Sequence, residues 1–533
     1  MRKRSTVGVA GATGVLACLV VCACGLRPQD TPPILTPDRN AAIDQITANS
    51  LRGHVGFLAS DLLAGRDTPS VGLDLAAEYI AAQFRRAGLE PAGNDGFFQT
   101  TEWKVLEVDP ASFRCVISHG DESIHLAPED VSLSERGTVD LQNVPMVFLK
   151  SIDEESLKTL PAEQVEGRAV ICALPEPKPE GDAKASGRLS VARLQSPVVS
   201  RLKELKALAV VWLDATSTRG SGLAKGRLID PESRTNVPPR APTAADKPVS
   251  IVIHDPAART LLETSDSLSF SLQLGPPLAR PVVLKNVAGI LRGSDPALKD
   301  TYVIVSAHYD HVGVGGRAGD SDHIFNGAND DASGTSMVMQ LAETLAKMPQ
   351  RPRRSILFLT FFGEEKGLLG SRYYGRHPLV PLDKTAAMIN LEHVGRTDDN
   401  EGEQKLRGSL TGFDFTDIGP IFERAGRAVG VEVFKHPRNS DSFFGRSDNQ
   451  ALADRGVPAH TFCVSYTFPD YHAVGDHWDK IDYDNMAVIG KALALGILSL
   501  ADQEQAPLWN ESNTKTARYV KAWKALHGKP PAE

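Results

Sequence analysis

Continuous apolar runs alternate with amphipathic segments over the C-terminal half of the chain, between Val282 and Ala501. Short apolar runs predict buried strands, and longer segments with apolar residues at helical spacing predict helices. The expected strands are residues 302–307, 355–362, 386–391 and 459–464, and the expected helices are residues 333–347, 415–429 and 485–500. Apolar strands that alternate with helices favour an α/β fold with a mainly parallel sheet flanked by helices on both faces.

Two other patterns precede this region. Apolar residues at helical spacing between Leu73 and Phe84, followed by Gly88 as a candidate C-cap, predict an amphipathic helix. Farther along, short apolar runs separated by polar loops rich in Gly, Pro and Ser are typical of an inserted β-rich domain. The predicted division is a leader over residues 1–24, a linker over 25–38, an N-terminal part of the main domain over 39–128, the insert over 129–276, the rest of the main domain over 277–502 and a peripheral tail over 503–533.

The composition excludes one class of partner. With 41 % hydrophobic and 23 % charged residues, the chain has the composition of a folded globular protein. Its net charge of -8 and isoelectric point near 6.0 leave no basic surplus for a phosphate backbone, so nucleic acid is not an expected partner. Cys115, Cys172 and Cys463 form no CxxC metal pattern, and the sequence alone neither pairs them nor determines the oligomeric state.

The first residues have the form of an export signal. A basic start, Arg2-Lys-Arg, precedes an apolar stretch from Val7 to Ala23. This stretch is marginal for a membrane span of about 20 residues, so cleavage is favoured over a retained anchor, and no later segment is expected to cross a bilayer. The stretch ends in Val21-Cys-Ala-Cys-Gly, which resembles a bacterial lipobox with Cys24 as the lipidated residue. The expected location is the bacterial cell envelope, with membrane anchoring through Cys24, or the exterior after simple secretion.

Five segments place ionisable residues just after a predicted strand or just before a predicted helix. One such residue by itself is most often a structural hydrogen-bonding group. Five segments at the carboxyl edge of one sheet would gather several carboxylates, which repel one another without a cation between them. Two His and three carboxylates without Cys suit two divalent ions of the zinc type. The segments are residues 308–311, 329–331, 363–365, 390–393 and 471–476.

These segments coincide with five ordered motifs. They read His308-Tyr-Asp-His-Val-Gly, Asn326-Gly-Ala-Asn-Asp-Asp-Ala-Ser-Gly, Phe361-Phe-Gly-Glu-Glu-Lys-Gly, Asn390-Leu-Glu-His-Val-Gly and Tyr471-His-Ala-Val-Gly-Asp. In this order they resemble the motifs of the co-catalytic dizinc aminopeptidases, metallopeptidase family twenty-eight, over roughly residues 282–500. The resemblance implies a zinc-aminopeptidase fold and a hydrolase that removes N-terminal residues from peptides with two zinc ions.

The resemblance also implies a role for each site residue. Glu364 would act as the general base, and Asp310 would orient a ligand imidazole. The family often has a cis peptide after the bridging carboxylate, here between Asp330 and Asp331. The implied metal ligands are His308 and Glu392 for one ion, Glu365 and His472 for the other, and Asp330 as the bridge between them.

Two positions leave alternatives open. The family usually has Asp where this chain has Glu392, which is one methylene longer but still an oxygen ligand; the alternative is a salt bridge beside His393. Asp448 lies in a segment that resembles the family's substrate-side loop, and it either faces the substrate or caps the helix that follows.

Other functions on the same scaffold remain alternatives. The insert resembles a protease-associated domain near residues 165–171 and 208–211, which would shape access to the site. A glutaminyl cyclase or a carboxypeptidase would keep similar metal motifs, whereas a non-catalytic receptor of this fold would usually have lost ligands. Nitrogen and oxygen ligands also admit cobalt or manganese in place of zinc.

Overall fold

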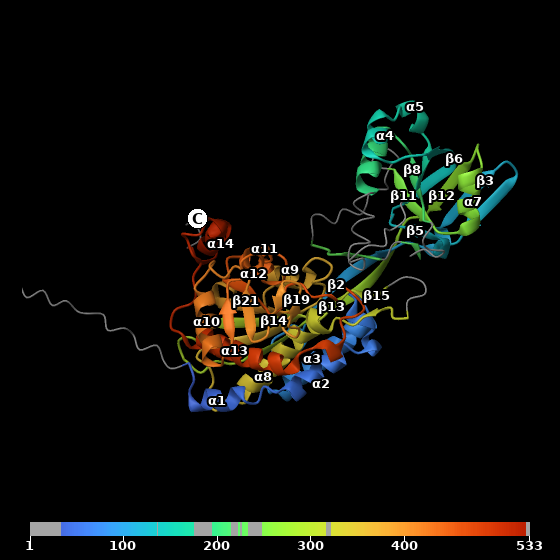
Figure 1. Ribbon diagram of the computed structural model, residues 1–533. Helices are drawn as coiled ribbons and strands as arrows, with labels where there is room; N and C mark the ends of the chain where they lie inside the picture. The colour runs from blue at the N-terminus through green and yellow to red at the C-terminus, as the bar shows by residue number, and fades with distance from the viewer. Residues whose placement is uncertain are drawn as a thin grey trace, which may run out of the picture.

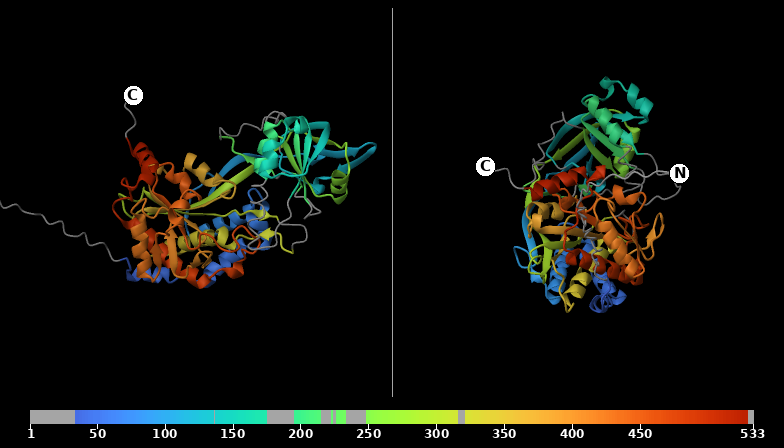
Figure 2. Two further views of the ribbon diagram at one scale, coloured as in Figure 1. Left: turned by 45° about the horizontal axis from the view of Figure 1, so that its top comes forward. Right: turned by 90° about the vertical axis from the view of Figure 1, so that its left-hand side faces the viewer.

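The computed structural model describes residues 34–135, 137–174, 195–214, 222–223, 226–232, 248–315 and 321–528. The predicted leader and Cys24 therefore lie outside the described residues. Figure 1 shows a larger unit built on one sheet and a smaller unit that stands away from it. The long strands β2 (Phe98–Glu107) and β13 (Leu278–Leu291) run from the larger unit to the smaller one, as Figure 1 and the left view of Figure 2 show.

The sheet of the larger unit is mixed, with a parallel centre. Its central strands β17 (Ser355–Phe361), β14 (Tyr302–His308), β18 (Thr385–Glu392) and β23 (Ala459–Cys463) pair in parallel in this order. Almost every residue of these strands is buried, which explains their continuous apolar sequences. Antiparallel neighbours extend the sheet on both sides, namely β13, β2, β1 (Glu90–Pro91) and β10 (Arg227–Ile229) on one side and β21 (Arg407–Leu410) on the other, with β22 (Glu432–Phe434) parallel to β21.

Helices cover both faces of this sheet, which confirms the predicted α/β class. One face packs against α1 (Pro37–Ile43), α2 (Ala48–Leu58), α3 (Val71–Arg86), α8 (Ser333–Ala346), α10 (Ile418–Ala428) and α13 (Tyr483–Asp502). The other face packs against α9 (Leu369–Arg376), α12 (Asn449–Ala453) and α14 (Ala517–His527), near the short α11 (Asn439–Ser442).

Helix α13 has the length and apolar composition of a membrane span, although no segment after the leader was expected to have them. However, 78 % of its most apolar window is buried inside the protein. Its neighbours are α2, α8, α10 and two central strands. The apolar residues of α13 are therefore accounted for by the core.

The smaller unit is built on a second mixed sheet with its own core. The strand order is β4 (Glu122–Leu126), β3 (Arg114–His119), β12 (Ser269–Leu274), β6 (Val139–Leu149), β7 (Ala169–Ala173), β8 (Ala209–Leu213), β11 (Val249–Ile253), β5 (Val131–Leu133) and β9 (Gly222–Leu223). Helices α4 (Glu154–Thr159), α5 (Ala162–Val165) and α7 (Pro256–Thr264) belong to this unit, as Figure 1 shows.

The sheet of the smaller unit begins before residue 129, where the sequence pattern predicted the start of the insert. Strands β3 and β4 precede that boundary and pair with β12, so they belong to the smaller unit. Conversely, β10 falls inside the predicted insert but pairs with β2 of the main sheet. Local patterns identify strands but not their partners, because pairing depends on residues far apart in the chain.

The C-terminal segment is not peripheral as predicted. Trp509 and Tyr519 are 5 % and 3 % exposed and belong to the core under α12. The Trp509 indole donates a hydrogen bond to the Gly456 carbonyl oxygen. A few large aromatic side chains in a polar segment are enough to fix it to the domain.

Candidate metal centre and active site

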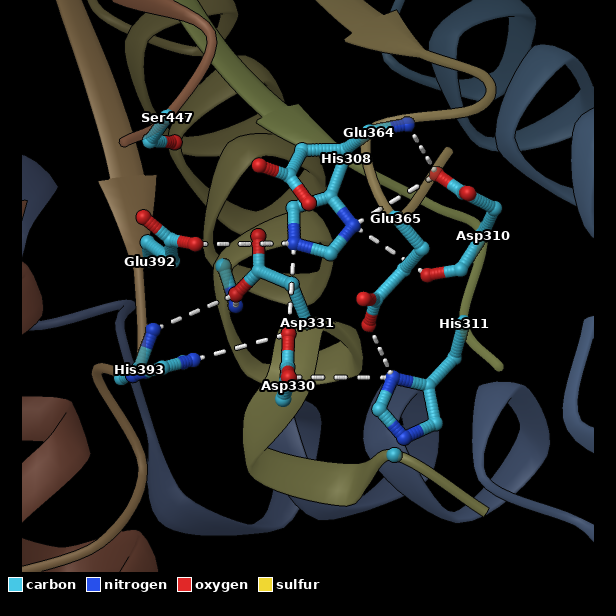
Figure 3. A network of polar contacts seen from close by, with 12 residues as sticks. His308, Asp310, His311, Asp330, Asp331, Glu364, Glu365, Glu392, His393 and Ser447 are labelled. Atoms are coloured by element: carbon cyan, nitrogen blue, oxygen red, sulfur yellow. Dashed lines mark hydrogen bonds and ion pairs between the residues drawn. The ribbon is translucent and has the colours of Figure 1, made fainter. Parts of the chain in front are cut away.

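The parallel centre of the main sheet brings the predicted site residues together. His308 is the last residue of β14, Glu392 is the last residue of β18, and Glu364 and Glu365 follow β17. Asp330 lies just before α8, in a short turn with a cis peptide to Asp331. Since parallel strands all end at the same edge, these carboxylates and imidazoles converge there (Figure 3).

The first group of ligand atoms comes from His308, Asp330 and Glu392. The Nε2 atom of His308 lies 3.3 Å from Asp330 Oδ1 and 3.8 Å from Glu392 Oε1. One ligand atom from each of these three residues lies within 4.8 Å of the other two. Ligands about 2.0–2.2 Å from one zinc ion have separations of this order.

The second group surrounds the other oxygen of Asp330. His472 Nε2 lies 3.1 Å from both Asp330 Oδ2 and Glu365 Oε2. His311 Nδ1 lies 2.7 Å from Glu365 Oε1, and His311, Asp330 and Glu365 form the second set of atoms within 4.8 Å of one another. Asp330 therefore offers one oxygen to each group, as a bridging carboxylate requires.

Several of these atoms are buried and have no hydrogen-bond partner among the described residues. They include His308 Nε2, Asp330 Oδ2 and Glu365 Oε1. Buried polar atoms are normally hydrogen-bonded, and leaving one unpaired costs roughly 1–3 kcal/mol. A cation in each group would partner these atoms and offset the repulsion among the carboxylates. The donor set thus fits two divalent ions.

The adjacent Glu364 and Glu365 lie in different electrostatic environments. Burial and the nearby carboxylates of Glu392 and Asp448 raise the pKa of Glu364 well above its usual value, although His308 opposes them. Burial and Asp330 also raise the pKa of Glu365, but the imidazoles of His311 and His472 outweigh them and lower it to about 2. Opposite pKa shifts in neighbouring carboxyl groups suit two different roles. Glu364, with the raised pKa, is suited to exchange a proton, and Glu365, with the lowered pKa, is suited to remain charged as a ligand.

A layer of supporting residues fixes the loops that carry the ligands. Asp310 lies beside His308, whose Nδ1 is 3.2 Å from the Asp310 carbonyl oxygen and 3.5 Å from its Oδ1. The same Oδ1 accepts a hydrogen bond from the Glu364 backbone N–H at 3.1 Å. Asp476 accepts hydrogen bonds from the backbone N–H groups of Asn329 and Asp330. Asp310 therefore holds both a ligand and the segment of the candidate base.

Arg66 is a supporting residue that sequence patterns do not reveal. Its guanidinium is fully buried and donates hydrogen bonds to the carbonyl oxygens of four residues. They are Leu58, Tyr309, Asn326 and Gly327, so Arg66 ties the N-terminal region to two ligand loops. Nothing in the local sequence around a single Arg predicts such a position, because its partners lie more than 240 residues away in three of the four cases.

A cavity of about 60 Å³ opens beside the metal groups. Its lining combines Asp330, Glu364, Glu392, His393 and His472 with residues that lie in β23 or follow β21, β23 and α11. The latter are Thr411, Phe443, Arg446, Thr461, Cys463, Tyr466 and Tyr471. A peptide end entering this cavity would meet the candidate base and ligands.

Asp448 does not line this cavity. Its side chain is fully buried at the start of α12, makes no capping hydrogen bond, and has both carboxylate oxygens unpaired among the described residues. Burial raises the pKa of Asp448 to about 7. Asp448 therefore stands at the N-cap position of α12, as one of the two alternatives had it, but its side chain does not cap the helix and does not line the cavity.

Comparison with known proteins identifies the domain that carries this cluster. Residues 286–496 match the profile of peptidase family M28. This part of the chain is an M28 peptidase domain. All of the expected metal ligands, Glu364 and Asp310 fall inside the matched residues.

Curated relatives of the M28 domain include fungal and bacterial proteins. A probable zinc metalloprotease of Leptosphaeria maculans is 35 % identical over 202 residues, which are 37 % of this chain and 44 % of the relative. Aminopeptidase YwaD of Bacillus subtilis is 25 % identical over 229 residues, covering 42 % of this chain and 46 % of the relative. The matches therefore span about half the length of these relatives.

Solved structures share the fold over most of the chain. An aminopeptidase from Aneurinibacillus sp. strain AM-1 has a TM-score of 0.52 and 18 % identity, with 88 % of this chain and 97 % of that chain covered. A zinc aminopeptidase from Bacillus subtilis has a TM-score of 0.52 and 17 % identity, with 86 % and 96 % covered. The M28 domain and its smaller companion unit thus have the overall architecture of these proteins.

The structure brings all five expected ligands of the M28 domain into one cluster, together with two histidines that were not among the expected metal ligands. His311 follows the first ligand by three residues, and His393 follows Glu392 directly. His393 Nε2 lies 3.5 Å from Asp330 Oδ1. Their positions inside two of the ligand motifs were the available signal.

Proposed function

We propose that the protein is a metal-dependent exopeptidase that removes N-terminal residues from peptides and binds two zinc ions. The observation that carries this proposal is the pair of ligand groups that share Asp330 beside a cavity lined by Glu364. The names of the relatives, zinc metalloproteases and an aminopeptidase, support the same activity.

The residues divide between metal binding and proton transfer. His308 and Glu392 would hold one ion, Glu365 and His472 would hold the other, and Asp330 would offer one oxygen to each. When bound, zinc supplies Lewis acidity that activates a water molecule and polarises a peptide carbonyl. Glu364 accepts the proton of this water and delivers it to the leaving amine, a role that suits its raised pKa and its position in the cavity wall.

The cavity also accounts for action at a chain end. The carboxylates of Glu364 and Glu392 in the wall attract a free α-amine. Substrate amines are therefore held beside the metal groups, and blocked N-termini are excluded.

Two measurements test the proposal. Elemental analysis of the purified protein should give close to two zinc per chain. A panel of aminoacyl-anilides should be hydrolysed, whereas the N-acetylated forms of the same compounds should not. One zinc per chain with full activity contradicts the two-metal assignment. Conversion of an N-terminal glutaminyl peptide to its cyclic form, without anilide hydrolysis, replaces the peptidase by a cyclase.

We also propose that the protein is exported and anchored to the bacterial cell envelope through a lipid on Cys24. The basic start, the apolar stretch and the lipobox-like Val21-Cys-Ala-Cys-Gly support this location. Mass spectrometry of the mature N-terminus tests it. An acylated N-terminal Cys24 is the expected result, and a free N-terminus at another residue indicates secretion after ordinary cleavage.

A further inference from the structure

His311 is a fully buried histidine inside the metal cluster, and it is not one of the five expected ligands. Its Nδ1 atom lies 2.7 Å from Glu365 Oε1 and 3.8 Å from Asp330 Oδ2. Despite this proximity, neither ring nitrogen of His311 and neither of these two oxygens has a hydrogen-bond partner among the described residues. Figure 3 shows the ring facing both carboxylates.

The protein holds the His311 ring in this position from two sides. The His311 backbone N–H donates to the carbonyl oxygen of Arg66 at 3.2 Å. The ring packs on Gly327, where a Cβ atom would lie 2.5 Å from His311 Cγ. Gly327 also has a φ of 59°, in the left-handed region that favours glycine. The backbone thus leaves a space of the right shape for this imidazole.

Two buried histidines outside the cluster have the hydrogen bonds that a structural histidine needs. His54 Nδ1 lies 2.9 Å from the Tyr79 hydroxyl, and both ring nitrogens of His460 have partners, in Thr416 and Thr411. An unpaired polar group in the core is costly. His311 therefore differs from these histidines, and the missing partner must lie where Nδ1, Asp330 and Glu365 face one another.

We propose that His311 is a further ligand of the second metal ion, which it binds through Nδ1 together with Asp330, Glu365 and His472. Imidazole nitrogens and carboxylate oxygens are the ligands that zinc takes, and the ligand atoms of His311, Asp330 and Glu365 lie within 4.8 Å of one another. The inference rests on the two-metal part of the proposed function and does not depend on peptide hydrolysis.

A fourth protein ligand makes the two metal positions unequal. His308, Asp330 and Glu392 would supply three protein ligands to the first ion, the number usual in catalytic zinc sites. Asp330, Glu365, His472 and His311 would supply four to the second ion, the number usual in structural zinc sites.

Proton NMR of the cobalt-substituted protein tests the ligand assignment without an activity assay. Paramagnetic Co²⁺ shifts the ring N–H proton of each coordinated imidazole far outside the normal range, and this signal disappears in D₂O. With two Co²⁺ per chain, we expect three such signals, from His308, His472 and His311. Two signals, at a measured content of two Co²⁺ per chain, overturn the inference and leave His311 as a hydrogen-bond partner of Glu365.

Variants assign the signals. His311→Asn should remove one shifted N–H signal, and the matched variant His54→Asn, at another buried histidine outside the cluster, should remove none. Retention of all three signals in His311→Asn overturns the inference. The measured Co²⁺ content shows whether the inference or the proposed function has failed. If the wild-type protein binds fewer than two Co²⁺ ions, the two-metal assignment of the proposed function is wrong, and the ligand set of the second ion is wrong with it.

Discussion

Glu364 and Glu365 are neighbours in the chain whose substitution should have different consequences. Glu365 lies among the ligands of the second group, whereas Glu364 lines the cavity. Glu364→Gln should keep near-full zinc content and lose about 10²- to 10⁴-fold in turnover, as is typical for a general base. Glu365→Gln should lose zinc and recover part of its activity when zinc is added. Metal content and kcat measured in parallel check both expectations.

The exposed Glu403→Gln provides the control for this pair, because it makes the same change in β20 (Gly402–Glu403), outside the residues that line the cavity. It should change neither zinc content nor kcat. Near wild-type turnover in Glu364→Gln, or equal loss of metal in both site variants, would show that base and ligand have been exchanged or misassigned.

His460 should make the stability of the protein sensitive to acid. It is fully buried between Thr416 and Thr411, and burial lowers its pKa to about 4. The unfolded chain, with a histidine pKa near 6.5, takes up a proton first as the pH falls. Neutral His460 therefore makes its full contribution to the free energy of unfolding above pH 6.5. This contribution is lost between about pH 6.5 and 4, at about 1.4 kcal/mol per pH unit.

Unfolding of the main domain at pH 7 and pH 5, in metal-free protein, checks this dependence. His460→Gln should be less stable at pH 7 but should lose less stability between the two values than the wild type. The exposed His125→Gln should follow the wild type. Parallel pH dependence in wild type and His460→Gln would contradict the assignment.

At the scale of elements, the segment after α13 should stabilise the main domain. Trp509 packs in the core between Phe444 and Tyr519, and its ring stacks on Tyr519 at a centroid distance of 4.8 Å. Trp509→Ala should lower the free energy of unfolding by about 3–5 kcal/mol, as expected for a buried aromatic side chain. Urea denaturation measures the loss.

Leu508→Ala is the matched control, because Leu508 precedes Trp509 but is 53 % exposed. Its effect should lie within about 0.5 kcal/mol. If Trp509→Ala were equally mild, the C-terminal segment would be peripheral after all.

At the scale of the whole molecule, the smaller unit should be removable. Strands β2 and β13 pair in antiparallel register from Val287 and Phe98 up to Leu278 and Glu107, so the insertion leaves and returns at one point. Replacing residues 108–277 by Asn-Gly should close these strands into a hairpin, because a two-residue turn of this type fits the twist of paired strands.

The shortened protein should fold and bind metal, with a lower midpoint of thermal unfolding. The lower midpoint is expected because the deletion removes β10 from the sheet edge and the ion pair between Asp230 and Arg376. Circular dichroism and zinc analysis measure the outcome. Loss of the metal sites on deletion would mean that the smaller unit supports the cluster.

The sequence by itself determined the four central strands, the three longest helices between residues 282 and 501 and the gathering of the five expected ligands, but not the shorter elements α9, β21, β22, α11 and α12. The reason is local: apolar periodicity identifies each element, and parallel strands bring their carboxyl ends to one edge. Side chains placed just after these strands, such as His308 and Glu392, could therefore be assigned to one site without knowledge of any long-range contact.

Only the tertiary structure decided which distant segments meet. Several features depend on contacts between residues far apart in the chain, which the local sequence does not predict. They are the pairing of β2 with β13, the hydrogen bonds of Arg66 to the ligand loops, the burial of Asp448 and Trp509, and the contact of His311 with Glu365. These contacts depend on how the elements pack in three dimensions, because pairing partners and burial are set by the whole fold rather than by the periodicity of one segment.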